Sequence, residues 1–192
     1  MTTPSQKAEG RSRKEVGKTK AEARGLLIAT LLLLAAFLAP SVAAAQSLVI
    51  LVRHAERADG GAGANTMTTA PADPLLSAAG EARAARLAQM LADAGVTAIY
   101  ATEFRRTQDT GKPLATKLGL QVQAMPAKDS PGLAAKLKST HAKGVVLVIG
   151  HSNTVPDVIR ALGGPAVTIA DAEYDSLFVL VPATGALTRI RY

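Results

Sequence analysis

The chain has 192 residues, of which 48% are hydrophobic and 19% are charged, so it can bury a core and is predicted to form one globular domain. It has no cysteine, which excludes disulfides, thiolate metal sites and a cysteine nucleophile. The formal net charge is +7, but the basic excess is concentrated in residues 1–25 and aromatic residues make up only 3%, so we expect no nucleic-acid partner.

The amino-terminal segment has the order of a secretory signal. Residues 1–25 are polar and basic, residues 26–39 are almost wholly apolar, and a Pro-Ser pair then breaks the run before a stretch of small residues. A charged region, an apolar core and a small-residue cleavage site in this order are typical of a signal peptide. Ala43 and Ala45 fit the two small positions, which predicts cleavage before Gln46.

An uncleaved membrane anchor stays open as an alternative. A span needs roughly 20 apolar residues, and the run reaches that length when it is taken as residues 26–45. In both cases the basic flank stays in the cytoplasm and the rest of the chain is exported. We therefore expect a basic tail with a signal peptide or anchor over residues 1–45, and one folded domain over residues 46–192. That domain would be periplasmic or secreted, or anchored on the extracytoplasmic side.

After this segment, short apolar runs alternate with helical patterns. Strands are expected over residues 48–52, 96–101, 120–125, 145–149, 176–181 and 186–191. Helices are expected from Ser77 to about residue 93 and over residues 103–118, 131–139 and 153–162. Strands that alternate with helices indicate βαβ units, so we predict a three-layer α/β/α fold with a mostly parallel sheet.

Local signals refine these elements. Ser77 has the character of a helix N-cap, and Glu81 lies in the first turn. The apolar face of that helix is predicted to be formed by Ala82, Ala85, Leu87, Met90 and Leu91. Residues 57–75 are rich in Gly and Pro and are predicted to be a loop. Thr184-Gly185 indicates a tight hairpin between the last two strands.

Three of the predicted strands lead into chemically reactive residues. The first ends at Arg53-His54, the second is followed by Arg105-Arg106, and the fourth leads into His151. Because the carboxyl ends of parallel strands share one edge of a sheet, two histidines and at least two arginines should converge there. Guanidinium groups match the oxygens of phosphate, so the convergence predicts a phosphate site.

The same fragments carry a resemblance to a known family. LVRHAE, FRRTQDT and VIGHSN, in this order and each at a strand end, resemble the histidine phosphatase superfamily, which also holds the cofactor-dependent phosphoglycerate mutases. Leu76–Gly80 is similar to the family's opening of the first helix, and the resemblance runs from Leu48 to about Leu180. It implies a phosphoglycerate mutase-like α/β fold and a phosphomonoester hydrolase that uses neither a metal nor a cofactor.

The resemblance also implies roles for individual residues. His54 matches the nucleophile, which takes the phosphoryl group as a phosphohistidine. Arg53, Arg106 and His151 match the residues that bind the phosphate. Arg105 lies outside the pattern and is expected to be a charge at the rim of the site.

The proton donor for the leaving group is the least defined role. Many relatives use a glutamate, but this chain has no Glu between Glu103 and Glu173. Asp129, which follows the third strand, is the first candidate, and a surface position for it is equally compatible with the sequence. Glu56, two residues after His54, is the second candidate.

The expected substrate is a phosphorylated small molecule, with specificity set by the loop at residues 57–75 and by residues 126–131. A phosphohistidine protein phosphatase and a non-catalytic module that binds a phosphorylated ligand are the alternatives. Export argues against the first, and the intact set of histidines and arginines argues against the second.

We also expect His141 to be solvated and the acidic residues to form a solvated turn without a metal, namely Asp171, Glu173 and Asp175. The sequence carries no signal for the oligomeric state.

Overall fold

The computed structural model describes residues 47–60 and 73–192. The predicted signal peptide or anchor and the middle of the predicted loop at residues 57–75 lie outside the described residues. Within the described part of the chain, no helix is both long enough and apolar enough to cross a membrane.

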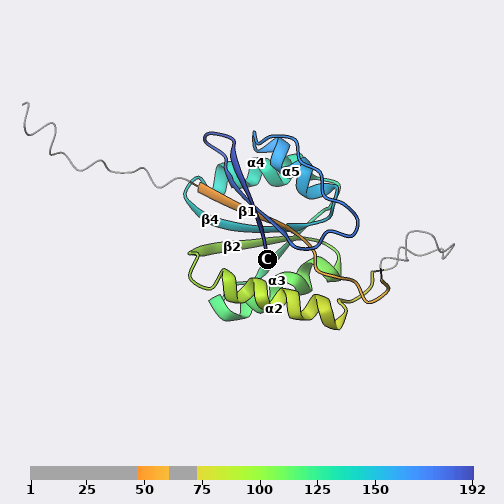
Figure 1. Cartoon of the computed structure of the whole chain (residues 1–192). Helices are drawn as coiled ribbons and strands as arrows, with labels where there is room; N and C mark the ends of the chain where they lie inside the picture. The colour runs from red at the N-terminus through yellow and green to blue at the C-terminus, as the bar shows by residue number, and fades with distance from the viewer. Residues whose placement is uncertain (1–46, 61–72) are drawn as a thin grey trace, which may run out of the picture. The chain divides into compact units, whose positions relative to one another are not determined.

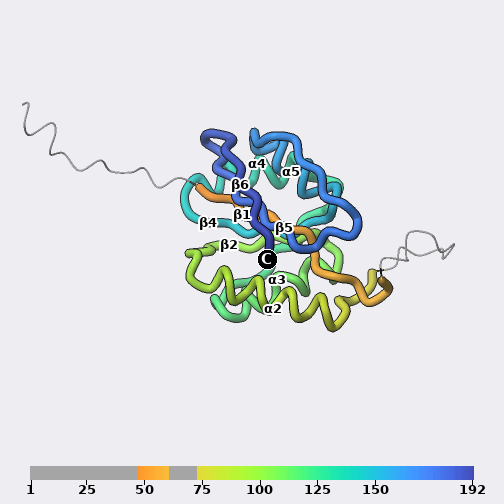
Figure 2. Tube along the Cα trace, in the orientation of Figure 1, coloured from red at the N-terminus to blue at the C-terminus, as the bar shows by residue number. Residues whose placement is uncertain are grey.

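The described strands form one six-stranded sheet in the order β3-β2-β4-β1-β5-β6. Figure 2 labels β2, β4, β1, β5 and β6 on the chain trace. In chain order they are β1 (Ser47–Arg53), β2 (Val96–Thr102), β3 (Val122–Met125), β4 (Gly144–Gly150), β5 (Ser176–Val181) and β6 (Ala186–Arg191). The pairs β1–β4, β2–β4 and β2–β3 are parallel, while β5 pairs antiparallel with β1 and β6 antiparallel with β5. The predicted mostly parallel sheet and its final hairpin are confirmed.

Helices cover both faces of this sheet (Figure 1). One face carries α2 (Ala78–Met90) and α3 (Arg105–Leu118), and the other carries α4 (Ser130–Thr140) and α5 (Thr154–Ala161). The three-layer α/β/α architecture is therefore confirmed. It follows from the chain order, because the path from β1 through β2 to β3 moves outward along the sheet and the return to β4 places the next helix on the opposite face.

The central strand β1 shows how the sequence fills both layers. Val49 and Leu51 pack with residues of α4 and α5, whereas Ile50 and Val52 pack with residues of α2 and α3. All four are at most 5% exposed. Successive side chains of a strand point to opposite faces, so a strand with helices on both sides must be apolar throughout.

The first helix begins where the sequence predicts and buries a different face. The Ser77 hydroxyl accepts a hydrogen bond from the Gly80 N–H at 3.1 Å, which confirms the N-cap. The helix ends at Met90, earlier than expected. The buried positions of the helix are Gly80, Ala84, Leu87 and Ala88. Ala82, Ala85 and Met90 are exposed, so the predicted face was wrong at these positions, because alanine carries little information about which side of a helix is buried.

Gly80 brings α2 against the backbone that follows β1. A Cβ atom at this position would lie 2.3 Å from the Glu56 carbonyl oxygen. That same oxygen accepts a hydrogen bond from the Ser77 N–H at 2.9 Å. Ala55 is fully buried beneath this contact, packed with Leu76 and Ala84. The start of α2 thus fixes the path of the chain immediately after His54.

Candidate active site

The two histidines of the predicted site are brought together by the pairing of β1 with β4. Arg53 lies opposite Gly150 in the parallel register. The His54 N–H extends this ladder by donating to the Gly150 carbonyl at 2.8 Å. His151 follows Gly150 directly, and the two imidazole ring centroids are 5.2 Å apart.

The hydrogen bond of the His54 ring defines which nitrogen can react. Nδ1 lies 2.7 Å from the Ala55 carbonyl oxygen, which can only accept, so Nδ1 carries the proton. Nε2 has no hydrogen-bond partner among the described residues. Burial lowers the pKa of His54 to about 4, and the nearby Arg106 and Arg53 charges act in the same direction, outweighing the Ala55 bond. At neutral pH the ring is therefore uncharged and Nε2 has a lone pair available for attack.

A chain of hydroxyl groups defines the tautomer of His151. The Thr107 hydroxyl donates to the Phe104 carbonyl at 2.6 Å, so in its 2.8 Å contact with Thr102 it is the acceptor. The Thr102 oxygen is then left to accept from Nε2–H of His151 at 2.9 Å. The remaining nitrogen, Nδ1, is unprotonated in the neutral ring. Burial, followed by the proximity of His54 and the neighbouring arginines, lowers the pKa of His151 to about 3.

The helix that carries Arg106 is tied to the residue after the nucleophile. The Thr110 hydroxyl donates to the Arg106 carbonyl at 2.7 Å and accepts from the Ala55 N–H at 3.0 Å. Thr110 is only 1% exposed. The four-residue spacing between Arg106 and Thr110 is one helical turn, so this motif couples the position of Arg106 to that of His54.

Arg106 lies at the start of α3 and is oriented by two neighbours. Its guanidinium carbon is 4.3 Å from the centroid of the Phe104 ring, and Nη1 is 3.3 Å from Oδ1 of Asp73. Asp73 also accepts from the Arg105 N–H at 3.0 Å and so caps the helix. The Arg105 side chain does not line the pocket that holds the histidines. Of the two adjacent arginines, Arg106 thus lines the pocket and Arg105 does not.

Arg53 is held by the turn that precedes β5. Its Nη1 donates to the carbonyl oxygens of Ala170, Asp171 and Glu173 at 3.0, 2.7 and 3.1 Å. Its Nη2 donates to the Tyr174 hydroxyl at 3.3 Å, and the guanidinium carbon lies 4.1 Å from the Tyr174 ring centroid. These bonds leave the Nε side of the guanidinium without a partner among the described residues.

A pocket of about 970 Å³ is lined by both histidines and by three arginines, Arg53, Arg57 and Arg106. The Nε–H group of each arginine is buried and has no hydrogen-bond partner in the described part of the chain. Such groups are rare in native proteins and indicate a missing acceptor. Arg57, which also pairs with Asp59, was not singled out from the sequence. It lies three residues after His54, in an irregular segment where the spacing in the sequence does not predict the direction of a side chain.

The two predicted proton donors occupy different surroundings. Glu56 lines the pocket, but its carboxylate forms an ion pair with Arg83. Nε of Arg83 lies 2.9 Å from each carboxylate oxygen, and Nη2 lies 2.6 Å from Oε1. Burial alone would raise the pKa of Glu56, but the hydrogen bonds and charge of Arg83 outweigh it and leave this pKa below its usual value. The carboxylate therefore remains ionised and paired, which suits an anchor better than an acid.

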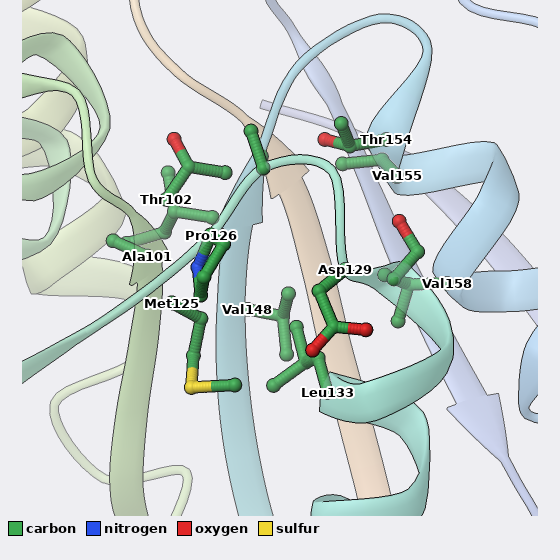
Figure 3. A pocket seen from close by; sticks show the side chains of 14 residues that line it. Ala101, Thr102, Met125, Pro126, Asp129, Leu133, Val148, Thr154, Val155 and Val158 are labelled. Atoms are coloured by element: carbon green, nitrogen blue, oxygen red, sulfur yellow. The ribbon is translucent and has the colours of Figure 1, made fainter.

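Asp129 is not brought to the pocket that holds the histidines. Its carboxylate caps α4 by accepting from the Gly132 N–H at 2.9 Å. Figure 3 shows it beside Leu133, in a separate and mainly apolar pocket. That pocket has a volume of about 20 Å³, which is the space of about one water molecule. This placement agrees with the alternative that Asp129 occupies a surface position. Two carboxylates that the sequence analysis did not assign to the site, Glu103 and Asp171, line the pocket instead.

Side chains that the sequence predicted to be solvated also have protein partners. Asp171 is exposed and the Asp175 side chain is 42% exposed, as predicted, whereas the Glu173 side chain is 14% exposed. Glu173 pairs with Arg189 and accepts from the Ser176 hydroxyl at 2.6 Å, and Asp175 pairs with Arg191. His141 lies 2.9 Å from the Tyr100 hydroxyl through its Nε2. In the part of the chain that the structure describes, no group of three or more His, Asp or Glu side chains is placed to bind a metal ion.

Comparison with known families and sequences gives two matches. The family model of the histidine phosphatase superfamily (branch 1) matches residues 49–127. A PE-PGRS family protein, PE_PGRS11 of Mycobacterium tuberculosis, is 30% identical over 169 residues, which cover 77% of this chain and 28% of that protein. The chain thus spans less than a third of the length of this relative.

Solved structures share the fold at low sequence identity. A mycobacterial glucosyl-3-phosphoglycerate phosphatase in complex with VO3 is 17% identical, with a TM-score of 0.58 over 76% of this chain and 98% of that one. A phosphoserine phosphatase from Entamoeba histolytica in complex with 3-phosphoglyceric acid is 13% identical, with a TM-score of 0.54 over 74% and 94% of the two chains. The phosphoglycerate mutase-like fold predicted from the sequence is confirmed.

The lowered pKa values of His54 and His151 predict that the protein loses stability on mild acidification. The unfolded chain takes up protons near pH 6.5, whereas the folded histidines do so only near about 4 and about 3. Stability is therefore complete above about pH 6.5 and falls as the pH drops toward these values. Thermal unfolding in phosphate-free buffer should show a midpoint that decreases from about pH 7.5 to about pH 5. His151→Asn should flatten this slope, and an equal slope in the variant would contradict the assignment.

Proposed function

Because the chain belongs to the histidine phosphatase superfamily, we propose that it is a phosphomonoester hydrolase that acts through a phosphohistidine on Nε2 of His54. The observation that carries the proposal is the set of three buried Nε–H groups without acceptors, on Arg53, Arg57 and Arg106, around a neutral imidazole. A phosphate dianion supplies the missing acceptors, and guanidinium groups bind its oxygens in pairs.

In the first step, Nε2 of His54 attacks the phosphorus atom of the bound ester. The P–N bond forms, the ester P–O bond breaks, and its electron pair stays with the leaving oxygen, which takes a proton. The phosphorylated ring is cationic, and the bond from Nδ1–H to the Ala55 carbonyl stabilises that charge. In the second step a water molecule attacks phosphorus, the P–N bond breaks and neutral His54 is restored.

The arginines supply the charge neutralisation that phosphoryl transfer requires. Catalysis of this reaction depends on positioning and on electrostatic stabilisation of the equatorial oxygens. Three guanidinium groups at fixed positions provide both, so the proposed reaction is metal-independent and needs no cofactor. His151 adds a further donor, because a bound dianion favours its protonated form and thereby places a proton on Nδ1.

The proposed substrate is a phosphorylated small molecule. The pocket is open and lined by charged side chains rather than by an extended apolar surface. The phosphatases that share the fold are named for small phosphorylated metabolites, which supports a substrate of this class. A non-catalytic binding module would have no need for an unpartnered Nε2 on His54.

We further propose that the domain works outside the cytoplasm, on the basis of the order of basic, apolar and small residues before Gln46. Amino-terminal sequencing of the protein from a fractionated bacterial host should find Gln46 as the first residue in the exported fraction. An intact Met1 in the soluble cytoplasmic fraction would contradict export, whereas an intact Met1 in the membrane fraction would identify the anchored form.

Removal of the nucleophile should abolish turnover. His54→Ala is expected to lower kcat for p-nitrophenyl phosphate by more than about 10³-fold, because no other group can form the covalent intermediate. His141→Ala serves as the matched control, since this histidine contacts Tyr100 and does not line the pocket. Rapid quenching with a radiolabelled ester should trap an acid-labile phosphoprotein in the wild type only. Undiminished turnover by His54→Ala would refute the mechanism.

The adjacent arginines of α3 offer a second matched pair. Arg106→Gln should weaken the binding of inorganic phosphate by about 30-fold or more, because the loss of a buried charge pair costs about 2 to 5 kcal/mol. Arg57→Gln should act in the same direction, while Arg105→Gln should leave the affinity unchanged. Isothermal titration calorimetry measures all three, and equal affinities for the Arg106 and Arg105 variants would disprove the assignment.

A further inference from the structure

A proton donor for the leaving oxygen must be a group that reaches the pocket and is not already held as an ion pair. Within the described residues, three carboxylates line the pocket with His54: Glu56, Glu103 and Asp171. Glu56 is bound through both oxygens by Arg83 and is not available. The choice is therefore between Glu103 and Asp171.

Glu103 accepts one hydrogen bond at its main-chain carbonyl and one at its carboxylate. It directly follows β2, and its main-chain carbonyl accepts from Nε2 of Gln108 at 2.8 Å. Its side-chain Oε2 accepts from the Ala127 N–H at 2.7 Å. The carboxyl group thus extends from the end of β2 to the segment after β3, which is the segment where the sequence led us to expect an acid at Asp129.

The second oxygen of Glu103 is available for a proton. Oε1 has no hydrogen-bond partner in the described part of the chain, and Glu103 forms no ion pair there. Glu103 lines the pocket, and a carboxyl group that is held through one oxygen by a backbone N–H keeps its other oxygen free to carry a proton in a fixed direction.

Asp171 is less suited to the role. Its main-chain carbonyl anchors Arg53, but no described residue forms a hydrogen bond with its carboxylate. Both residues are exposed, but only the carboxylate of Glu103 is held by a hydrogen bond, so Asp171 is not positioned for proton transfer in the way that Glu103 is.

We propose that Glu103 is the catalytic acid of the proposed hydrolase, an inference that rests on the proposed function. As the ester P–O bond breaks, the O–H bond of the Glu103 carboxylic acid breaks and its proton passes to the leaving oxygen, which departs as an alcohol. The resulting carboxylate then accepts a proton from the water that attacks the phosphohistidine. The acid is restored, and phosphate is released.

The dependence of the rate on the leaving group tests this role. Glu103→Gln should lower kcat/KM for the alkyl ester glycerol 2-phosphate by about 10²- to 10⁴-fold, which is the usual contribution of a general acid. For p-nitrophenyl phosphate the loss should stay below about tenfold, because p-nitrophenolate departs without a proton. Glu81→Gln is the matched control, because this exposed glutamate of α2 does not line the pocket, and it should leave both values unchanged. Asp171→Asn tests the competing carboxylate. Binding of inorganic phosphate to Glu103→Gln, measured by calorimetry, should equal that of the wild type and report an intact site.

The outcomes separate the two proposals. Equal losses on both esters in Glu103→Gln, or a selective loss on the alkyl ester in Asp171→Asn, would overturn the assignment of Glu103 while leaving the hydrolase intact. A wild-type protein that turns over neither ester would instead overturn the proposed function. If Glu103→Gln fails to fold, Glu103→Ala is used instead, and the same comparison of the loss on the alkyl ester with the loss on p-nitrophenyl phosphate applies.

Discussion

The parallel pairing of β1 with β4 is the constraint on which the site depends. Arg53 lies opposite Gly150, and the residue that follows each of them is a histidine. The hydrogen bond from the His54 N–H to the Gly150 carbonyl keeps the two segments together beyond the ends of the strands. A shift of one residue in this register would move one imidazole to the opposite face of the sheet. The other parts of the site are attached to this pair: α3 through the bond of Thr110 to Ala55, and the turn before β5 through Arg53.

The same arrangement concentrates positive charge in a buried place. Burial already disfavours the charged form of both imidazoles, and three neighbouring guanidinium groups disfavour it further, so the histidines stay neutral. The arginines cannot relieve the repulsion by losing protons. Each is instead stabilised by acceptors away from the histidines: backbone carbonyls for Arg53, Asp59 for Arg57 and Asp73 for Arg106. One N–H of each group still faces no acceptor, and an anion of high charge density is the partner that this field favours.

The strand-end residues could be read from the sequence because their positions follow from topology. When a buried parallel strand ends in Arg-His, both residues lie at the carboxyl edge of the sheet, independently of the side chains that pack around them. The same holds for His151, which follows β4. The placement of Asp129 could not be read in this way, because its role depends on where α4 begins, and an aspartate one residue before a helix is drawn to the free N–H groups of the first turn. Arg57 and Tyr174 lie on irregular segments, where spacing carries no information about direction. The buried stripe of α2 was missed because alanines occupy both its buried and its exposed positions.

The hydrogen bonds of the site also account for its protons. The Ala55 carbonyl holds one proton on Nδ1 of His54, and the Thr102–Thr107 pair holds another on Nε2 of His151, so neither neutral ring has a proton on the nitrogen that is left without a partner. This suits attack by His54, which needs a lone pair, but neither neutral ring offers a proton to the departing oxygen. The Nδ1 proton that we assign to His151 in the complex with a dianion serves to bind the transferring phosphate. The arginines do not give up protons. We assign the proton to a carboxyl group, and Glu103 differs from Glu56 in that no described cation forms an ion pair with it, whereas Glu56 is bound to Arg83. In this proposal the two glutamates of the pocket have different roles. Glu56 is a fixed anion that orients the chain after His54, and Glu103 is the acid that exchanges a proton with the substrate.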